Sequence, residues 1–167
     1  WVMPYSGCYA YSHGTEQQKE RPWFCSSIAH QTLTLNGQNS VNASRHRLWH
    51  DEPRHTVLVF ENESYPGWTH RRTVFFVDRA FLVLIDEAIG EPRGVLDLHF
   101  QLAPGPATID ATNRTAFSRS PEGGNVLVWA PKDSLIDLVE EMGQTSSRFH
   151  VKEARPAFAF RHRQDHA

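Results

Sequence analysis

Apolar residues in this chain recur mostly at every second position or in short β-branched runs, and this periodicity constrains the fold more than any other feature. Gly, Pro or Asn interrupt the runs at intervals of about 8 to 15 residues, as is typical of short strands joined by turns. We therefore predict an all-β fold, a two-sheet antiparallel β-sandwich of about ten strands. The predicted strands are Thr32–Asn36, His55–Phe60, Arg72–Asp78, Phe81–Glu87, Val95–Leu102, Thr115–Ser118, Asn125–Trp129, Leu135–Glu140, Arg148–Lys152 and Ala157–Arg161.

One segment also has the features of a helix. Asp133 or Ser134 supplies an N-cap there, and Leu135, Leu138 and Val139 share one helical face. The same residues alternate well enough to form a strand, which we favour. Tight turns are predicted at Asp78-Arg79, Glu91–Gly94 and Pro121–Gly124.

The length and charge of the chain limit the classes of function that it can have. The 167 residues are enough for one domain with a buried core. A net charge of −2 and a pI of about 6.6 provide no basic surface for nucleic acid. No segment approaches the ~20 apolar residues of a membrane-spanning helix. We therefore expect neither nucleic acid nor a membrane as a partner.

The histidines and cysteines show no metal-site spacing. Ten histidines are spread along the chain without an HExxH or a His-x3-His pattern, so most are expected at the surface or at the edge of the core. Cys8 and Cys25 fit neither a zinc ribbon nor a CxxC motif. A disulfide between them and two separate thiols are both open.

Two segments near the start carry residues suited to chemistry. Ser26–Gly37 places His30 at the mouth of an alternating strand that ends in an Asn-Gly turn. Upstream, Gly7–Gly14 is a Gly-flanked, aromatic-rich loop in which Tyr11 and His13 lie close together. A tyrosine and two histidines are therefore candidates for one site.

Together these segments resemble the start of the heparinase II/III-like C-terminal domain of polysaccharide lyases, the heparinase and alginate lyase type. In that family an Ala-His-x-Thr-Leu strand follows a Gly-Thr-x-x-Tyr loop, and this chain has Ala29–Leu33 after Gly7-Cys8-Tyr9-Ala10-Tyr11. The resemblance covers about residues 5 to 161. Further segments that match in order are Tyr65–Phe76, Phe81–Glu87, Leu98–Pro104, Glu141–Ser147 and Lys152–Pro156.

The resemblance implies cleavage of 4-linked uronate polymers, either glycosaminoglycan or alginate, by β-elimination. That step needs a base for the C5 proton, an acid for the departing C4 oxygen and a group that neutralises the uronate carboxylate. Tyr11 matches the catalytic tyrosine of the family, and Tyr9 is its rival because the loop alignment can slip by two residues. Enzyme activity would belong to the full-length lyase, and the isolated domain is expected to be inactive.

His30 matches the family histidine that ligates a structural zinc. Zinc takes about four ligands, and the acidic ligand of the family comes just before the Gly-Thr turn, where this chain has Tyr5-Ser6. The resemblance puts the other metal histidine and the acid-base partner before residue 1. We therefore expect zinc at His30 only in the full-length protein, and none in this chain alone.

Three residues are candidates for binding an anionic sugar. His13 and Arg72 supply positive charge, and the indole of Trp23 stacks on a sugar ring. Each has a plainer interpretation as a solvated cation or a half-buried aromatic, and packing explains Arg72 equally well. Further side chains of the same kinds are Arg21, His70 and Trp68.

The family also implies a helical toroid domain, which these residues do not contain. Residues 1–167 are thus expected to form a single β-sandwich domain, the C-terminal part of a larger lyase that is periplasmic or secreted. Its expected partners are an acidic polysaccharide and the toroid domain. The alternatives are a non-catalytic carbohydrate-binding or structural β-sandwich that has lost the site, and an exported interaction module unrelated to sugars.

Overall fold

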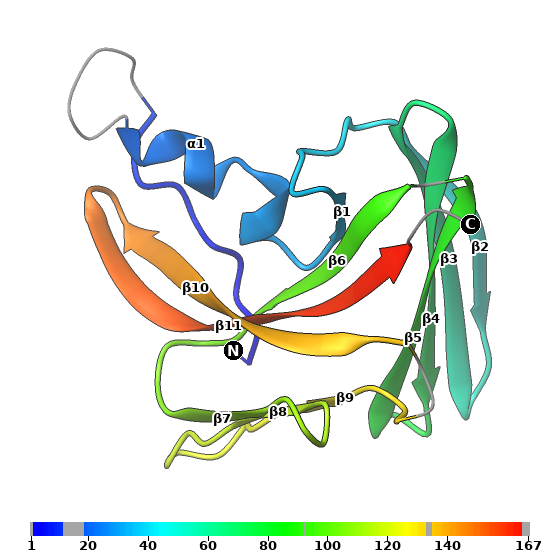
Figure 1. Ribbon diagram of the computed structural model, residues 1–167. Coiled ribbons are helices and arrows are strands. Elements are labelled where there is room, and N and C mark those ends of the chain that lie inside the picture. Colours follow the sequence, from blue (N-terminus) through cyan, green and yellow to red (C-terminus); the bar gives the residue numbers. More distant parts are fainter. Residues whose placement is uncertain (1, 12–18, 92, 133–134, 165–167) are drawn as a thin grey trace. The chain divides into compact units, whose positions relative to one another are not determined.

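The computed structural model describes residues 2–11, 19–91, 93–132 and 135–164 and is dominated by β-strands (Figure 1). Strands make up 58% and helices 5% of the structure, and the sheets are antiparallel, which confirms the predicted all-β fold. The elements are α1 (Arg21–Phe24), the 3₁₀ helix η2 (Ser27–Ala29), β1 (Leu33–Leu35), β2 (Ser44–Asp51), β3 (His55–Tyr65), β4 (Trp68–Val77), β5 (Phe81–Gly90), β6 (Gly94–Gln101), β7 (Ala107–Asp110), β8 (Thr115–Ser118), β9 (Leu127–Trp129), β10 (Asp137–Arg148) and β11 (Val151–Gln164).

The contacts divide the chain into two compact units, residues 1–39 with 95–164 and residues 40–94. The first unit contains a four-stranded sheet in the order β1-β6-β11-β10 and a three-stranded sheet in the order β7-β8-β9. Within this unit the N-terminal segment with α1 covers one face of the four-stranded sheet, and β7–β9 cover the other (Figure 1). The eleven strands found among the described residues therefore form three sheets rather than the predicted two. The interpretation of residues 1–167 as one domain stays a prediction.

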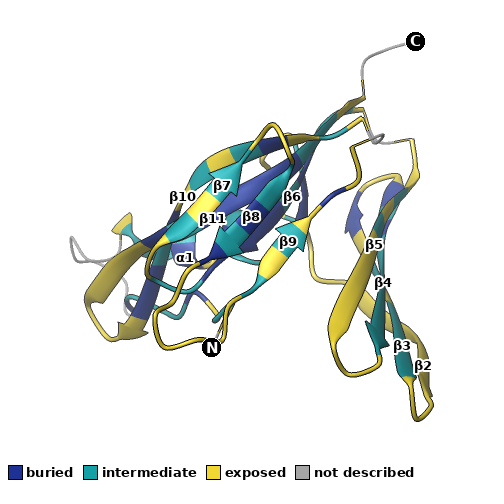
Figure 2. Cartoon of the chain, turned by 90° about the horizontal axis from the view of Figure 1, so that it is seen from below, coloured by how far each residue is buried: buried dark blue, intermediate teal, exposed yellow. Residues whose placement is uncertain are grey.

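The core of the first unit lies between its two sheets. Successive side chains of a strand point to opposite faces, so Phe158 and Phe160 of β11 enter the core while Ala157 and Ala159 face the other way. Phe100 of β6 stacks on Phe158 with ring centroids 5.2 Å apart. The dark blue stretches of these strands in Figure 2 mark this buried layer. Truncation of such a phenylalanine to alanine typically costs about 3 to 5 kcal/mol.

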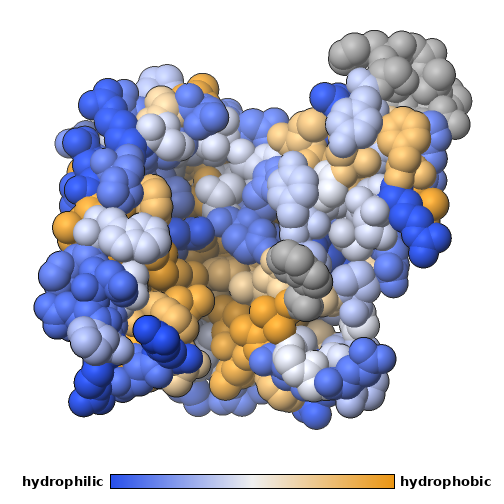
Figure 3. All heavy atoms as spheres, turned by 180° about the vertical axis from the view of Figure 1, so that it is seen from behind, coloured by the Kyte–Doolittle hydropathy of each residue, from blue (hydrophilic) through white to orange (hydrophobic). Residues whose placement is uncertain are grey.

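The second unit is a four-stranded antiparallel meander in the order β2-β3-β4-β5. The predicted turn at Asp78-Arg79 is confirmed, and both residues adopt left-handed φ angles of 50° and 53°. Apolar side chains of β5 reach the surface, including Phe81 at 54% and Leu82 at 60% exposure. Figure 3 shows patches of hydrophobic residues on the face that it draws.

Several predicted strands differ from the structure. β2 was missed because all of its side chains are exposed, so no burial pattern marks it, and β7 was missed as well. The predicted strand Arg148–Lys152 is wrong, since Phe149 and His150 form the turn between β10 and β11 and His150 has a φ of 59°.

The segment with features of both helix and strand is a strand from Asp137 onward, as we favoured, and its candidate caps lie outside the described residues. No helix in the described part of the chain is long and apolar enough to cross a membrane. Cys8 and Cys25 are both free thiols.

Candidate functional site

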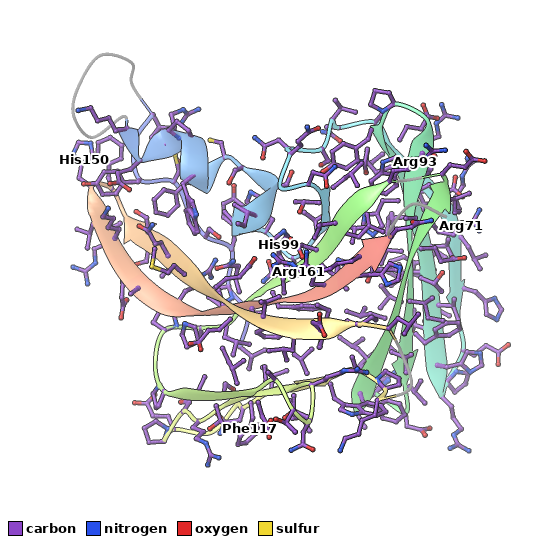
Figure 4. All side chains as sticks on the ribbon, in the orientation of Figure 1. Arg71, Arg93, His99, Phe117, His150 and Arg161 are labelled. Atoms are coloured by element: carbon purple, nitrogen blue, oxygen red, sulfur yellow. The ribbon has the colours of Figure 1, made fainter. Side chains whose placement is uncertain are left out.

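The face of the β1-β6-β11-β10 sheet that is turned away from the core is polar. Alternation places Asp97, His99 and Gln101 of β6 on this face, together with Arg155 and Arg161 of β11. Figure 4 shows His99 and Arg161 close together on the sheet beneath the N-terminal segment. All of these residues except Arg161 are at most 5% exposed. Such a buried polar layer must satisfy its hydrogen bonds internally.

Two interactions neutralise most of this layer. Arg161 donates two hydrogen bonds to the carboxylate of Asp97, at 2.7 and 2.9 Å. His99 lies 2.8 Å from Glu141 Oε2 through Nδ1 and 2.8 Å from Thr34 Oγ1 through Nε2. The Glu-His-Thr order is that of a hydrolytic triad. Because Thr34 is 0% exposed, however, this network holds strands together and is closed to any substrate.

Arg155 is a buried cation that no described carboxylate pairs with. Its Nη1 donates to Pro4 O at 2.7 Å and its Nη2 donates to Ser6 Oγ, which in turn donates to Ala29 O. Burial lowers the pKa of Arg155 to about 10, so the guanidinium is still protonated at neutral pH. Within the described residues, its Nε has no hydrogen-bond partner. This side chain ties the N-terminal segment to β11 and leaves positive charge beside it.

His30 lies just before β1 rather than in a strand, as the C-cap of η2. Its ring stacks on Tyr5 with centroids 5.1 Å apart and an interplanar angle of 15°. Burial, and then the charge of Arg155, lower the pKa of His30 below its ordinary value. A neutral imidazole is therefore favoured, which is the protonation state that binds a metal or accepts a proton.

The described residues around His30 do not complete a zinc site. The one grouping of three histidine, cysteine or carboxylate donors in the described part of the chain is at His50, Glu52 and His55, and His30 belongs to no such group. One face of the imidazole is covered by Tyr5. Zinc at His30 would need donors beyond these described residues and stays a prediction for the full-length protein.

Gly7 anchors the loop that carries Tyr11. It forms a parallel bridge with Ser146 of β10, and Ser146 N donates to Ser6 O at 2.8 Å. At Gly7, φ is +78° and an added Cβ would lie 2.0 Å from the Ser146 carbonyl oxygen. Only glycine fits this position. The loop is therefore held against the sheet rather than left free.

The two candidate tyrosines of the loop have different surroundings. Tyr11 is 70% exposed and stacks on Phe149 at 5.8 Å. Tyr9 is half-buried between Phe24 at 6.0 Å and His150 at 5.7 Å, and Lys152 Nζ lies 6.0 Å from its ring centroid. Tyr11 is thus the more exposed of the two, whereas Tyr9 supports the loop through packing.

These contacts form an aromatic platform that sequence reasoning did not assemble. We use this name for Tyr9, Tyr11, Phe149 and His150. The rings of Phe149 and His150 stack at 3.9 Å, and Figure 4 shows His150 at the tip of the β10–β11 hairpin. Phe149 and His150 were missed because they were assigned to a strand. The signal that could have identified them is the presence of two neighbouring rings in a hairpin turn.

The other predicted site residues are distributed more widely. Trp23 is half-buried and packs edge-on against Phe24 at 5.0 Å. Arg21 Nη1 donates to Ala10 O at 2.8 Å and lies 3.5 Å from Cys8 Sγ, so it braces the loop. His13 lies outside the described residues.

Arg72, His70 and Trp68 belong to the second unit. Arg72 Nε and His70 Nε2 lie 2.8 and 2.6 Å from the same Asp86 oxygen. Burial acts to raise the pKa of Asp86, but the His70 hydrogen bond and the Arg72 charge outweigh it and hold that pKa below its usual range. Trp68 is 5% exposed and stacks on Tyr65. The immediate role of Arg72 is thus to join β4 to β5.

A separate cavity of about 380 Å³ is lined mainly by the loops after β6 and β8. Its lining consists largely of glycine, proline, serine and alanine, with Glu122 as the one ionisable side chain. Because it offers no cation, it is a poorer match for an anionic ligand than the surface around Tyr11.

Known proteins match nearly the whole chain. The family model "Heparinase II/III-like, C-terminal" matches residues 2–163. The heparin-sulfate lyase of Bacteroides stercoris is 31% identical over 165 residues, which are 98% of this chain and 25% of that protein. The heparin-sulfate lyase of Pedobacter heparinus is 33% identical over 159 residues, 94% of this chain and 24% of that protein.

Solved structures agree with these matches. A crystal structure of the heparan sulfate lyase of Pedobacter heparinus has a TM-score of 0.91 at 32% identity, covering 96% of this chain and 25% of that one. A crystal structure of heparinase III has a TM-score of 0.88 at 25% identity over 98% of this chain and 25% of that one. This chain thus spans about a quarter of the length of the relatives it matches. Taken with the loop held by Gly7 and the histidine before β1, these matches show that the chain belongs to the heparinase II/III-like C-terminal family.

Proposed function

We propose that this chain is the C-terminal β-sandwich part of a polysaccharide lyase that cleaves a uronate-containing glycosaminoglycan of the heparan sulfate type. The observation that carries the proposal is the match of 94 to 98% of the chain to relatives named heparin-sulfate lyases. The exposed side chain of Tyr11, on a loop that is anchored by Gly7, carries a hydroxyl that suits such chemistry.

The proposed reaction is a β-elimination. A base removes the C5 proton of the uronate, the electron pair forms the C4–C5 double bond, and the C4–oxygen bond breaks. The departing oxygen then needs a proton, and we assign this donation to Tyr11. A group positioned for such a transfer typically contributes about 10² to 10⁴ to the rate. The base and the group that neutralises the carboxylate are proposed to come from the part of the lyase outside this chain.

The aromatic platform is proposed to hold the polysaccharide next to Tyr11. Phe149 is 52% exposed and offers a ring face to a sugar. Lys152 provides positive charge at the same place, although Glu20 pairs with it at 2.6 Å. Arg155 adds a buried positive charge under the N-terminal segment. Together they favour an anionic polymer over a neutral one.

The greater length of the relatives supports a further domain beyond this chain. We propose that a helical toroid domain completes the cleft and that further donors there join His30 around a zinc ion. Bound zinc would hold His30 and the loop near it in place. The protein is proposed to work in the periplasm or outside the cell, because its substrate is a large extracellular polymer.

The full-length protein incubated with heparan sulfate, heparin, chondroitin sulfate and alginate tests this proposal. The unsaturated uronate product absorbs in the ultraviolet, so its absorbance reports cleavage directly. We expect product from heparan sulfate and little from alginate. Absence of product with every polymer would contradict the lyase proposal.

A second candidate function is non-catalytic binding of carbohydrate. It is favoured by Tyr5, which stacks on His30 where the family places its acidic metal ligand. This candidate predicts that heparan sulfate is retained by the protein and released unchanged. Retention without product would support it, whereas product formation would exclude it.

A further inference from the structure

The tip of the β2–β3 hairpin in the second unit gathers three side chains of types that can ligate a metal, His50, Glu52 and His55. β2 ends at Asp51 and β3 begins at His55, and Glu52 N donates to His55 O at 2.9 Å across the turn. His50 lies in β2, and Glu52 directly follows the end of that strand, where the Glu52–His55 hydrogen bond continues the pairing. His50 and Glu52 are two residues apart and so share a face of the hairpin. His55 lies opposite Glu52 and points to that same face. The strand register therefore brings all three together.

A side-chain contact on the opposite face of the hairpin supports this assignment of faces. Asp51 pairs with Thr56 in the register, and Thr56 Oγ1 donates to Asp51 Oδ1 at 2.5 Å. Asp51 thus belongs to the other face and does not compete for the three donors. Arg54, in the turn, is bound to Asp78 at 2.7 Å. The described arginine nearest in sequence therefore does not neutralise Glu52.

The distances between the donor atoms suit a small ion. His50 Nε2 lies 3.1 Å and His55 Nε2 lies 4.0 Å from the two Glu52 carboxylate oxygens. The ligand atoms of the three residues all lie within 4.8 Å of one another. Ligands at about 2.0 to 2.2 Å from a tetrahedral zinc are separated by about 3.3 Å. Because no pair is more than 4.8 Å apart, a shift of at most about 1.5 Å brings the three donors to this spacing.

We propose that His50, Glu52 and His55 bind a divalent transition metal ion of the zinc class. Two imidazoles and one carboxylate match the donor preference of zinc, whereas calcium and magnesium prefer oxygen ligands. The three side chains are 53%, 53% and 42% exposed, so they are free to adjust around an ion. The fourth position is open to water. The bound ion joins β2, an edge strand whose side chains are all exposed, to β3.

Zinc binding by the protein that carries this chain tests the site, measured by competition with a chromophoric chelator. A His30→Ala background removes the other predicted zinc ligand. In this background we expect one zinc ion per chain, and each of His50→Ala and His55→Ala should weaken its binding at least about tenfold. Glu52→Gln should also weaken it, because the amide has no negative charge. Added calcium should not displace the zinc.

His46→Ala is the matched control. His46 is an exposed histidine of the same strand that packs on Phe60 at 5.4 Å and lies outside the three-residue group. Its removal should leave zinc affinity unchanged. As a second measurement, zinc should shift the imidazole NMR signals of His50 and His55 and leave that of His46 in place. Equal zinc affinity in the His50→Ala/His55→Ala double variant and its parent would overturn the proposal.

Discussion

The ring of Tyr5 stacks on the ring of His30, with centroids 5.1 Å apart and planes inclined by 15°. We predict from the family resemblance that His30 is the histidine that ligates zinc and that Tyr5-Ser6 stands at the position of the acidic ligand. An aromatic contact thus covers an imidazole that, in the family pattern, has a carboxylate beside it. Burial and the charge of Arg155 lower the pKa of His30, so its neutral form is favoured.

Tyr5→Asp should therefore raise the pKa of His30 above that of the parent protein. Tyr5 is 69% exposed, so the fold should tolerate the change. Tyr5→Asn is the control, because it removes the stacking ring without adding charge. NMR titration of the His30 ring measures both variants. Equal pKa values in the two would mean that the carboxylate does not reach His30.

Tyr11→Phe should lower the turnover of the full-length lyase on heparan sulfate by about 10² to 10⁴, because it removes a proton donor and little else. Tyr9→Phe should change turnover by less than about threefold, since the Tyr9 ring contributes packing. Initial rates of ultraviolet absorbance decide between them. The reverse order of effects would move the catalytic assignment to Tyr9.

Gly7→Ala should destabilise the first unit by more than about 3 kcal/mol, because the methyl group meets the Ser146 carbonyl and the backbone is left-handed. Gly37→Ala is the matched control: its φ is +68°, but no atom lies within 4 Å of the added carbon. It should cost only about 1 kcal/mol. Urea unfolding monitored by circular dichroism measures both. Similar costs for the two variants would show that the Ser146 contact is not what requires glycine.

Asp86→Asn should destabilise the second unit by about 3 to 5 kcal/mol, because it removes the negative charge opposite a largely buried Arg72. Glu63→Gln breaks the exposed pair with Arg45 and should cost less than about 1 kcal/mol. Each change neutralises one carboxylate, so the difference between the two costs in stability reports the effect of burial. Urea midpoints for the two variants provide the measurement, and a small effect at Asp86 would show that its ion pairs are not needed.

Stability should fall in two stages as the pH is lowered. The pKa of His30 is lowered in the folded state, so the unfolded chain takes up the proton first and stability is lost as the pH falls below about 6.5. Asp86 also has a lowered pKa, so its contribution is present above about pH 3.9 and is lost as the pH falls through its folded value. Urea midpoints against pH should lose the first stage in His30→Asn and the second in Asp86→Asn. Unchanged curves in these variants would assign the stages to other groups.

The sequence by itself determined the β-rich architecture and the location of key turns. Period-two alternation identifies strands such as β6, because a strand that buries one face carries buried side chains at every second residue, a pattern that is visible within a short stretch of sequence. Asn36, Gly37 and Asp78 are residue types that tolerate the positive φ found at these turns, whereas Arg79 is not and takes its left-handed φ from the tight β4–β5 turn. The loop from Gly7 to Tyr11 and His30 were identified as candidates because their local motifs match the family.

The tertiary structure alone decided which side chains meet. β2 was not predicted because both of its faces are exposed, so burial does not impose an alternation of apolar and polar residues on its sequence. Tyr11 meets Phe149, and Arg155 meets Ser6, across well over a hundred residues. The hairpin register also decides that His50, Glu52 and His55 share a face. Such encounters depend on strand order and register, which are set by packing of the whole fold and not by any local pattern.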